Sequence, residues 1–441
     1  MLKSSHEIRD PIHVFIRLDS DERRVLDSRP FQRLRHIHQL ALSYLVYPSA
    51  THKRFEHSLG VMELASRIFD RVTQPEFIQD SLRDLIPVNE LSYWRRVLRM
   101  AALCHDMGHL PFSHAAEDEL LPEGWDHERL TRAIIQSPEM AAIWDKMAVP
   151  LKIDDIVRLA LGPRRAGDLG FNMWQAILSE IIVGDAFGAD RIDYLLRDSY
   201  HTGVAYGRFD HHRLIDTLRI LPPAVDPAPS SGPESKGEPT LGVERGGLQS
   251  AEALLLARYF MFSQVYFHRV RRIYDLHLKD FLRDHLENGS FPTEVATHLS
   301  WTDNEVTAAI FSASRDPAAR GHSAAKAIAH REHFKVLWEW NPVDAENPYR
   351  GRELFAEAEL RFGSGNVRHD KLERGASIAN FPVLLRDGKV LSSTLLSTVL
   401  TALPTASIEY LFIHPDLRKD GIEWLAANKD RVFHQERGDN R

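Results

Sequence analysis

Four side chains with nitrogen or oxygen donors could together bind a metal ion, although they lie far apart in the sequence. They are His57, the adjacent pair His105 and Asp106, and Asp190. Two imidazoles and two carboxylates suit a divalent cation, and Mn, Fe, Zn, Mg, Co and Ni all accept this mixed set of donors. The His-Asp pair follows the apolar run 101–104, where a carboxylate needs a cation or dense hydrogen bonding. We therefore expect one buried divalent metal ion.

A helix-like segment carries Asp190 together with further polar side chains. If residues 188–198 form a helix, four of them fall along one side at three- and four-residue spacing: Asp190, Tyr194, Arg197 and Asp198. This face would offer a carboxylate to the metal and, one or two turns away, a phenol, a guanidinium and a second carboxylate. Such a mixture suits a polyanionic substrate that carries a sugar. The alternative is a solvated face held by Asp–Arg pairs, which is the usual meaning of such charges.

The elements that must position these residues are helices. After His57, apolar residues recur at three- and four-residue spacing, which predicts an amphipathic helix. They are Val61, Leu64, Ala65, Ile68, Phe69 and Val72. Similar periodicity covers residues 97–103, 174–182 and 248–282. We therefore expect helices to dominate the first 290 residues.

Two regions depart from this helical pattern. Residues 222–247 are rich in Pro, Ser, Gly and Glu, which predicts a mobile insertion at the tip of a β-hairpin between 218–221 and 240–243. Beyond residue 290, segments 381–385 and 389–392 flank Arg386-Asp387-Gly388 as a second hairpin, and 408–413 is typical of a strand. The predicted fold class is mainly α, with an inserted β-hairpin loop and a smaller mixed α+β C-terminal lobe over residues 291–441.

Composition limits the class of protein. The 441 residues, 43% hydrophobic and 27% charged, are typical of a soluble globular protein. A net charge of −7 gives no global reason to expect nucleic-acid binding and leaves only a local basic patch as a route to it. With no N-terminal signal segment and no run of roughly 18 apolar residues, we expect a cytoplasmic protein without a membrane partner. Cys104 is the single cysteine, which excludes intrachain disulfides and indicates a small core residue.

Five motifs in the first 200 residues resemble those of one family. They are Asp10-Pro11-Ile12-His13, Phe31-Gln32-Arg33-Leu34-Arg35 with Gln39-Leu40, Arg54-Phe55-Glu56-His57-Ser58-Leu59-Gly60-Val61, residues 104–114 and residues 190–198. In this order they resemble the HD-domain deoxynucleoside triphosphate triphosphohydrolases, the group that contains the mammalian sterile-alpha-motif and HD-domain protein and bacterial dGTPase-like enzymes. The resemblance implies an HD-domain helical core, which we expect to fill residues 1–290.

The resemblance also implies roles for individual residues at the reacting centre. It makes His57, His105, Asp106 and Asp190 the metal ligands. The additional active-site histidines are His109, His114 and His127. Glu117 matches an acidic residue that orients a histidine.

A further set of positions matches residues that contact the substrate. Those that contact phosphates or sugar are Arg54, Arg191, Tyr194 and Asp198, and those that line the deoxyribose pocket are Gln39 and Leu40. Arg191 stands where the mammalian relative has lysine, which keeps the charge but changes the geometry of a phosphate contact. Weaker candidates, since the alignment shifts there by a residue, are Tyr266, His268 and Arg269.

The activity that the resemblance implies is metal-dependent hydrolysis of a deoxynucleoside triphosphate to deoxynucleoside and inorganic triphosphate. A further Mg ion would accompany the nucleotide, and the protein would be a homo-oligomer, a dimer or tetramer, which in some relatives takes a nucleotide activator. The residue types agree with this chemistry, because a metal and cationic side chains stabilise charge on phosphate oxygens while histidines move protons.

Two alternatives remain open from the sequence. The first is another HD-type phosphohydrolase, a nucleotidase or phosphodiesterase, because the fold and the ligands do not fix the substrate. The second is a nucleotide-sensing or nucleic-acid-binding protein in which the site is regulatory. The complete ligand set, the additional histidines and the acidic net charge favour an enzyme over this second alternative.

Overall fold

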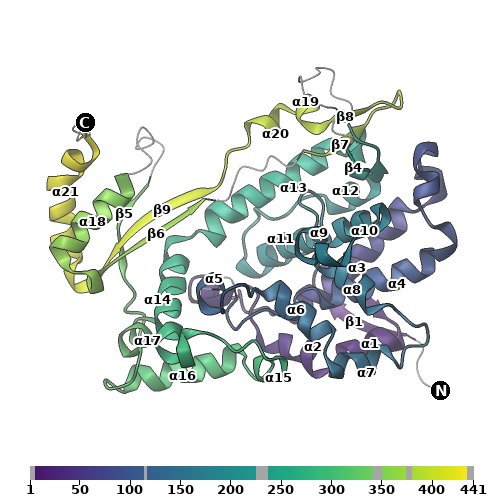
Figure 1. Ribbon diagram of the computed structural model, residues 1–441. Coiled ribbons are helices and arrows are strands. Elements are labelled where there is room, and N and C mark those ends of the chain that lie inside the picture. The colour runs from purple at the N-terminus through teal and green to yellow at the C-terminus, as the bar shows by residue number, and fades with distance from the viewer. Residues whose placement is uncertain (1–4, 114–116, 225–236, 341–349, 374–379, 435–441) are drawn as a thin grey trace. The chain divides into compact units, whose positions relative to one another are not determined.

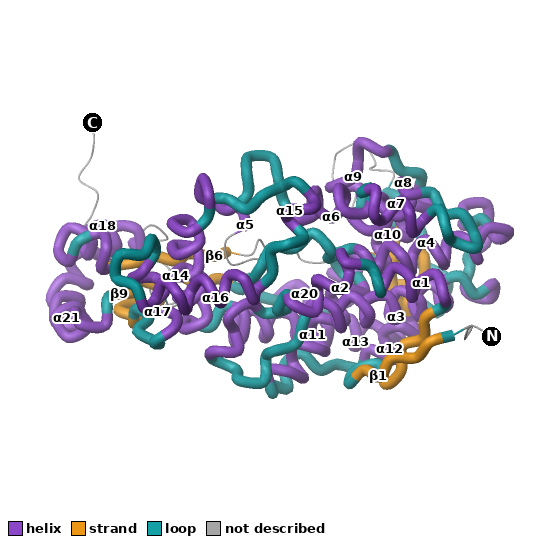
Figure 2. Tube along the Cα trace, turned by 90° about the horizontal axis from the view of Figure 1, so that it is seen from below, coloured by secondary structure: helices purple, strands orange, loops and turns teal. Residues whose placement is uncertain are grey.

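The computed structural model describes residues 5–113, 117–224, 237–340, 350–373 and 380–434, and most of these residues are helical (Figure 1). In Figure 2 the strands occupy only short segments of the chain. The predicted class, mainly α with an inserted β-hairpin and a smaller mixed lobe, is confirmed. No helix among the described residues is both long and apolar enough to cross a membrane.

Two compact units divide the chain, and each combines segments that are separate in sequence. Unit 1 comprises Met1–Met261, Phe291–Glu305 and Ser377–Leu403, and unit 2 comprises Phe262–Ser290, Val306–Ala376 and Pro404–Arg441. Two segments of unit 1 therefore lie beyond residue 290, in the part of the chain that the sequence assigned to the C-terminal lobe.

Three helices of unit 1 carry the predicted metal ligands. They are α3 (Arg54–Val72), α4 (Leu91–Cys104) and α11 (Ala189–Thr202), and α3 packs against both of the others. The apolar residues predicted to face the core along α3 are all buried, from Val61 to Val72. Because α4 ends at Cys104, His105 and Asp106 follow directly from its buried C-terminal turn.

Unit 1 contains further α-helices among its described residues. They are α1 (Ser20–Leu26), α2 (Arg29–Arg33), α5 (Glu117–Leu120), α6 (His127–Ile135), α7 (Pro138–Trp144), α8 (Ile153–Leu161), α9 (Pro163–Ala166), α10 (Met173–Val183), α12 (His211–Thr217), α13 (Leu248–Met261), α15 (Val295–His298), α19 (Ser393–Leu396) and α20 (Thr398–Ala402). The helical pattern predicted over 248–282 is interrupted after α13 by a π-helix, Phe262–Tyr266, before α14 (Arg269–His285) begins.

Unit 1 contains two small sheets. Strands β1 (His6–Asp10) and β2 (Val14–Leu18) form an antiparallel pair. Strands β3 (Leu218–Leu221) and β4 (Thr240–Glu244) form the predicted hairpin, with Leu218 opposite Val243. Residues 225–236, the centre of the predicted mobile insertion, lie outside the described part of the chain.

The second predicted hairpin belongs to unit 1. It consists of β7 (Pro382–Leu384) and β8 (Val390–Ser392), and β7 pairs in parallel with β4 through Val383 and Val243. The hairpin itself is confirmed, and it joins the sheet of β3 and β4. Alternation along the sequence predicts a strand without identifying its partner, and here the free edge of β4 supplies one.

Unit 2 is built around a three-stranded antiparallel sheet. Its strands are β5 (Lys335–Glu339), β9 (Ser407–Ile413) and β6 (Val367–Glu373), in that order, and β9 matches the predicted strand 408–413. Helices α18 (Arg350–Phe362) and α21 (Arg418–His434) share a core with the sheet that includes Leu337, Leu354 and Ile413. Helix α17 (His322–Ala329) packs on α14, and α16 (Asp303–Arg315) begins in unit 1 and continues into unit 2.

Candidate active site

The four predicted metal ligands come together where α3, α4 and α11 meet. Oδ1 of Asp190 lies 3.0 Å from Nε2 of His57 and 3.7 Å from Nε2 of His105. Oδ1 of Asp106 lies 3.3 Å from Nε2 of His105. The donor atoms of His57, His105 and Asp106 all lie within 4.8 Å of one another, which is compatible with one shared cation.

Hydrogen bonds leave one ring nitrogen of each imidazole facing the other donors. Nδ1 of His105 lies 2.7 Å from the carbonyl oxygen of Ala102, which can only accept, so Nδ1 carries the proton and Nε2 keeps its lone pair. That Nε2 atom is buried and has no hydrogen-bond partner. In His57, Nδ1 lies 2.8 Å from Oδ2 of Asp193, and Nε2 again faces the cluster. The buried lone pair of His105 beside these carboxylates fits a divalent cation, which these residues could hold in place of the proton that Nε2 of His57 shares with Asp190.

Neighbouring charges set the protonation of the cluster. Burial opposes a charge on His57, but hydrogen bonds to Asp190 and Asp193 outweigh burial and raise the pKa of His57 to about 10. Burial likewise opposes ionisation of Asp106 and Asp190, yet the neighbouring histidines hold the pKa of both carboxyls below the usual value. The site therefore keeps its carboxylates ionised, as cation binding requires.

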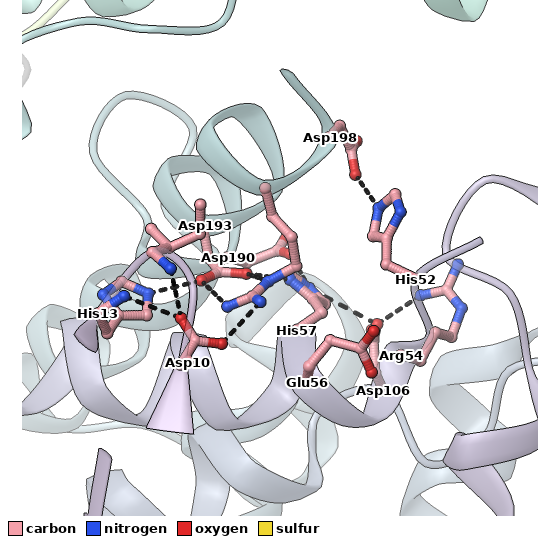
Figure 3. Close-up of polar contacts among 12 residues, drawn as sticks. Asp10, His13, His52, Arg54, Glu56, His57, Asp106, Asp190, Asp193 and Asp198 are labelled. Atoms are coloured by element: carbon pink, nitrogen blue, oxygen red, sulfur yellow. Dashed lines mark hydrogen bonds and ion pairs between the residues drawn. The ribbon is translucent and has the colours of Figure 1, made fainter. Parts of the chain in front are cut away.

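A second set of buried charges holds His57 in place (Figure 3). Asp193 accepts hydrogen bonds from His57 and from Nε2 of His13, each at 2.8 Å. Arg197 donates to Asp193 at 2.8 and 2.9 Å, and to Asp10 at 2.8 Å. Asp193 and Arg197 are fully buried. A histidine whose second ring nitrogen is bonded to a carboxylate keeps one tautomer and one orientation, which favours metal binding.

These contacts correct the prediction that Arg197 faces a substrate together with Asp190. Its guanidinium is enclosed by Asp10 and Asp193, so it serves the interior of the protein. The spacing in α11 did place Asp190 and Arg197 near one side of the helix, but the carboxylate of Asp10, on β1, decides where the guanidinium points.

Helix α3 approaches this ion cluster at Gly60. A Cβ atom at that position would lie 1.9 Å from Oδ1 of Asp193 and 2.5 Å from Nη2 of Arg197. Both atoms belong to hydrogen-bonded, buried groups that cannot move freely. Glycine is therefore required for the packing of α3 on α11.

A second group of polar residues lies beside Asp106. Nε2 of His109 is 3.1 Å from Oδ1 of Asp106, and its Nδ1 is bonded to the hydroxyl of Ser113. The ring of His127 stacks on that of His109, with centroids 4.0 Å apart. Glu117 accepts hydrogen bonds from the backbone N–H of His127, at 2.7 Å, and from its Nδ1. Glu117 thus fixes the orientation of the His127 ring.

The two stacked rings differ in their affinity for a proton. Burial, together with the charges of Arg54 and His127, holds the pKa of His109 well below its usual value. Burial also opposes a charge on His127, but Glu117 outweighs it and raises the pKa of that ring. Adjacent groups whose surroundings move their pKa values apart are suited to act as an acid and a base.

Two arginines beside the cluster have buried nitrogen atoms without a partner. Arg54 donates through Nη1 to Asp106, but its Nε and Nη2 atoms are buried and make no hydrogen bond. Arg191, which follows Asp190 in α11, has buried Nε and Nη1 atoms in the same condition. A buried guanidinium nitrogen that lacks an acceptor is costly, so both side chains are suited to an anionic ligand.

Backbone pairing places the predicted sugar-pocket residues near Arg54. The N–H of Gln39 donates to the carbonyl of His52 at 3.0 Å, and the N–H of Arg54 donates to the carbonyl of Ile37 at 3.0 Å. Oε1 of Gln39 is buried without a partner, and Leu40 is buried. The segment thus brings an unused amide oxygen and an apolar side chain to the start of α3.

Asp198 and Tyr194 lie on α11, beyond Asp190. Asp198 is buried, and Oδ1 accepts a hydrogen bond from Nε2 of His52 at 2.8 Å (Figure 3). His52 in turn stacks on His201, with centroids 4.3 Å apart. Tyr194, one turn after Asp190, is half-buried. The orientation of the Asp198 carboxylate is therefore fixed by a histidine that precedes α3.

Four predicted site residues lie outside the described part of unit 1. His114 lies outside the described residues. Tyr266, His268 and Arg269 belong to unit 2, so their part in the site stays a prediction. There, His268 accepts a hydrogen bond from the backbone of Val270 at the start of α14, and Arg269 lies 3.5 Å from Glu339.

A cavity of about 790 Å³ opens onto the cluster. His105, Asp106, His127 and Asp190 form one part of its wall. Other parts come from α9, α10, β4 and the segment that leads into β7. The volume lies within the range of small-molecule binding sites, so a ligand of nucleotide size could reach the cluster.

The sequence did not single out the residues that support the ligands. Asp193 lies one turn after Asp190 on α11, but only Asp190 was predicted to have a role in the site. Asp10 and His13 were quoted only as members of a motif. The sequence does contain a charged motif near the N-terminus and a charged helical segment at α11. Only the tertiary contacts show that the two form one ion cluster.

Two family models match the chain, an HD domain over residues 54–169 and an HD associated region over residues 209–346. The first match contains three of the predicted ligands, His57, His105 and Asp106. The last two are the adjacent His-Asp pair that gives the domain its name. The second covers α12, β3, β4, the helices from α13 to α17 and β5, a region in which the sequence predicted a hairpin and the helical periodicity of residues 248–282.

Relatives of known and unknown activity share these regions. An uncharacterized protein of Methanocaldococcus jannaschii is 38% identical over 272 residues, 62% of this chain and 48% of the relative. The deoxynucleoside triphosphate triphosphohydrolase SAMHD1 of Bos taurus is 31% identical over 307 residues, 64% of this chain and 48% of the relative. The chain thus spans about half the length of these curated relatives.

One solved structure is similar over its whole length. It is a hypothetical protein from Aquifex aeolicus with a TM-score of 0.77 and 32% identity, and the similarity covers 96% of this chain and 100% of that chain. The helical core, the His/Asp cluster and the two matching models agree. The chain therefore belongs to the HD-domain phosphohydrolase family.

Proposed function

We propose that the protein hydrolyses deoxynucleoside triphosphates to deoxynucleoside and inorganic triphosphate. The observation that carries this proposal is a pair of arginines, Arg54 and Arg191, whose buried and unpartnered nitrogen atoms adjoin a His/Asp cluster. Two unsatisfied guanidinium groups beside a cation site call for a ligand with several negative charges. The name of the SAMHD1 relative gives a deoxynucleoside triphosphate as such a ligand.

The proposed metal ligands are His57, His105, Asp106 and Asp190. When bound, a divalent cation would withdraw charge from the phosphate oxygens as a Lewis acid and make the phosphorus more open to attack. The residues of the chain supply the remaining interactions. Arg54 and Arg191 would bind phosphate oxygens through the nitrogen atoms that have no internal acceptor.

The nucleoside would be held by the residues near the start of α3 and on α11. Gln39 and Asp198 offer oxygen atoms to sugar hydroxyls, Leu40 offers an apolar wall, and Tyr194 offers a ring that a sugar can pack against. Because the carboxylate of Asp198 is fixed by His52, it can accept a hydrogen bond without reorganisation.

The histidines beside Asp106 would transfer the protons. His127, oriented by Glu117, and His109 would protonate the 5′ oxygen as it leaves and assist the attacking water, with His114 as a further candidate. Glu117 holds Nδ1 of His127, so the other ring nitrogen is the one that can exchange a proton with a ligand.

The test is product analysis with each deoxynucleoside triphosphate and several divalent metals, by ion-exchange chromatography. We expect deoxynucleoside and intact triphosphate. Release of pyrophosphate or orthophosphate would exclude the proposed bond. In ¹⁸O-labelled water the label should enter the triphosphate, because attack on the α-phosphorus breaks the bond to the 5′ oxygen, whereas label in the nucleoside would contradict that attack.

Matched variants connect the activity to the cluster. Asp190→Ala should remove turnover, while Asp168→Ala, at an exposed carboxylate paired with Arg132, should leave it unchanged. Cyclic nucleotides and monophosphates should not be consumed. Turnover of these compounds in preference to triphosphates would indicate a phosphodiesterase or nucleotidase on the same scaffold.

A further inference from the structure

Asp303 is a buried carboxylate that lies outside the HD domain match. It is the first residue of α16 and is 1% exposed. Oδ2 accepts hydrogen bonds from the backbone N–H and from Nδ1 of His38, at 2.7 and 2.6 Å. Oδ1 accepts a hydrogen bond from the backbone N–H of Phe112 at 2.7 Å. One side chain therefore bonds to two segments that are more than 70 residues apart in sequence.

Both segments belong to the proposed site. His38 directly precedes Gln39 and Leu40, the proposed sugar contacts. Phe112 lies in the loop between His109 and His114. Among the described residues, the hydrogen bonds of Asp303 go to His38 and Phe112 and to no proposed ligand or proton-transfer group, so an effect on the reaction would pass through the position of these two segments.

The contacts of His38 extend the connection to α3. Nε2 of His38 lies 2.6 Å from Nζ of Lys53, and residues 38 and 53 form an antiparallel bridge. Lys53 precedes Arg54, whose N–H is bonded to Ile37. The carboxylate of Asp303 thus fixes a ring that in turn fixes the residue before a proposed phosphate contact.

The loop at Phe112 needs such an acceptor. Phe112 has a φ of 53°, in the left-handed region that favours glycine, and its ring stacks on that of His38 with an interplanar angle of 5°. A non-glycine residue keeps this conformation only where its surroundings fix it. The bond from its buried N–H to Asp303 supplies part of that constraint.

A neighbouring contact ties the same segment to the HD pair. Arg33 is buried, and its Nε donates to the carbonyl of Trp301 at 2.8 Å while Nη1 lies 3.5 Å from the carbonyl of Met107. Met107 follows Asp106. Segment 301–303 is therefore held against the histidine loop by two independent side chains, Arg33 and Asp303.

We infer that Asp303 is a positioning residue that keeps the sugar-side segment 37–39 and the histidine loop 109–113 in one fixed arrangement. A carboxylate is suited to this role because its two oxygens accept from three donors at once, whereas an amide has a single accepting oxygen. The inference rests on the proposed function for the identity of the substrate, but the coupling of the two segments can be measured without one.

The first test compares Asp303→Asn with Asp155→Asn. Asp155 is a matched control, because it is also buried and bonded to several partners, Tyr93, Arg158 and Gln175, but contacts neither segment. For Asp303→Asn we expect kcat to fall by about 10- to 100-fold, because a small misplacement of reacting groups by a distant substitution can cost about 100-fold. Metal content should stay that of the wild type, and the preference for deoxynucleotides over ribonucleotides should fall. A loss of stability in both variants with kcat and preference unchanged would overturn the inference.

The second test uses amide hydrogen exchange and needs no substrate. In Asp303→Asn, exchange should rise together in peptides 36–42 and 107–113, because the substitution removes the acceptor that they share. A rise confined to residues 291–310, or the same rise in Asp155→Asn, would overturn the inference. If the wild type consumes no deoxynucleotide, the proposed function fails, and hydrogen exchange still decides the role of Asp303.

A second variant covers the case in which Asp303→Asn does not fold. His38→Gln leaves Asp303 and the backbone N–H of residue 38 intact but removes the ring that stacks on Phe112 and contacts Lys53. Exchange in peptide 107–113 should rise in this variant, although the substitution is remote in sequence. Unchanged exchange there would show that segment 37–39 and the loop are held independently, contrary to the inference.

Discussion

Two histidines of the candidate site in unit 1 have surroundings opposite to those of His277, a buried histidine of unit 2. At the candidate site of unit 1, His57 and His127 are bonded to the carboxylates of Asp193 and Glu117, and their pKa values are raised although burial opposes this. In unit 2, burial lowers the pKa of His277 to about 3, and nearby arginine and histidine charges add to the effect. His277 packs edge-on against Phe334 and accepts a hydrogen bond from its backbone.

The two kinds of surroundings correspond to two roles of a buried histidine, one chemical and one structural. An imidazole paired with a carboxylate keeps one tautomer and can exchange a proton or hold a cation, so burial there serves chemistry. An imidazole packed on aromatic rings stays neutral and acts as part of the core. Composition cannot separate the two kinds, because the partners of each ring come from distant parts of the chain. The predictions below test each side of the comparison.

The largest effect should follow removal of a proposed metal ligand. His105→Ala takes away the nitrogen atom that faces the cluster without a hydrogen-bond partner. We expect turnover to fall by more than the roughly 100-fold limit typical of outer-shell partners, together with loss of bound metal measured by elemental analysis. As a control, His330→Ala alters a half-exposed histidine of unit 2. Full metal content in His105→Ala would remove this residue from the ligand set.

A substitution that crowds Asp193, the carboxylate bonded to Nδ1 of His57, should have the next largest effect. Gly60→Ala places a Cβ atom against Asp193 and Arg197. We expect a loss of about 1–3 kcal/mol in the free energy of unfolding, as for overpacked cores, and metal affinity weaker by roughly 10- to 100-fold. The measurements are chemical denaturation and metal titration.

Gly167→Ala is the matched control, because no atom lies within 4 Å of the added Cβ position. It should change neither stability nor metal affinity. Normal metal affinity in Gly60→Ala would show that the position of Asp193 does not control His57, and the contrast between the two kinds of histidine would lose its basis.

Removing the unpartnered guanidinium should affect substrate binding alone. In Arg191→Gln we expect KM to rise by about tenfold or more, since a hydrogen bond to a charged group contributes about 1.5–3 kcal/mol. The melting temperature should stay the same or rise, because the buried Nε and Nη1 atoms have no internal acceptor to lose. Steady-state kinetics and thermal unfolding measure both quantities.

Arg132→Gln provides the comparison for that variant, because Arg132 is paired with Asp168 at the surface. Its KM should equal that of the wild type. A lower melting temperature for Arg191→Gln with unchanged KM would assign Arg191 to structure instead of phosphate binding.

The smallest effect concerns the packed histidine of unit 2. In the unfolded chain a histidine binds a proton below about pH 6.5, whereas the folded-state pKa of His277 is about 3. Between these values the unfolded state binds the extra proton, so the contribution of His277 is full above pH 6.5 and is lost as the pH falls toward 3. The slope is at most about 1.4 kcal/mol per pH unit.

This slope can be isolated by substitution. His277→Gln should make the stability of the full chain less dependent on pH between 6.5 and 4 than that of the wild type, as measured by denaturant unfolding. His330→Gln, at a half-exposed ring, should not. An unaltered pH dependence in His277→Gln would mean that this ring is not held neutral by packing.

Local patterns predicted the elements that carry the site. The spacing of apolar residues predicted α3, the helix-like segment 188–198 corresponds to α11, and the apolar run before His105 predicted that the HD pair would leave a buried helix. The two hairpins followed from turn residues and alternation. These predictions succeeded because each depends on residues within one or two turns of each other.

Predictions that depend on partners far away in the chain were incomplete. Arg197 shares a helix face with Asp190, yet it points to Asp10, and the hairpin of β7 and β8 joins β4, a partner that alternation did not identify. Nothing in the sequence distinguished Asp303 from other acidic residues at the start of a helix, because its role comes from accepting hydrogen bonds from residues 38 and 112.

The sequence by itself determined the helical class, the donor set of His57, His105, Asp106 and Asp190, and the family motifs around them. Only the tertiary structure decided which carboxylates face the cluster and which lie behind it, which ring nitrogens keep a lone pair, and which arginines lack an internal acceptor. The reason is physical: periodicity is a property of one helix, whereas the distance between donors depends on how α3, α4 and α11 pack. That packing requires a glycine at position 60, where the ion cluster meets the backbone of α3.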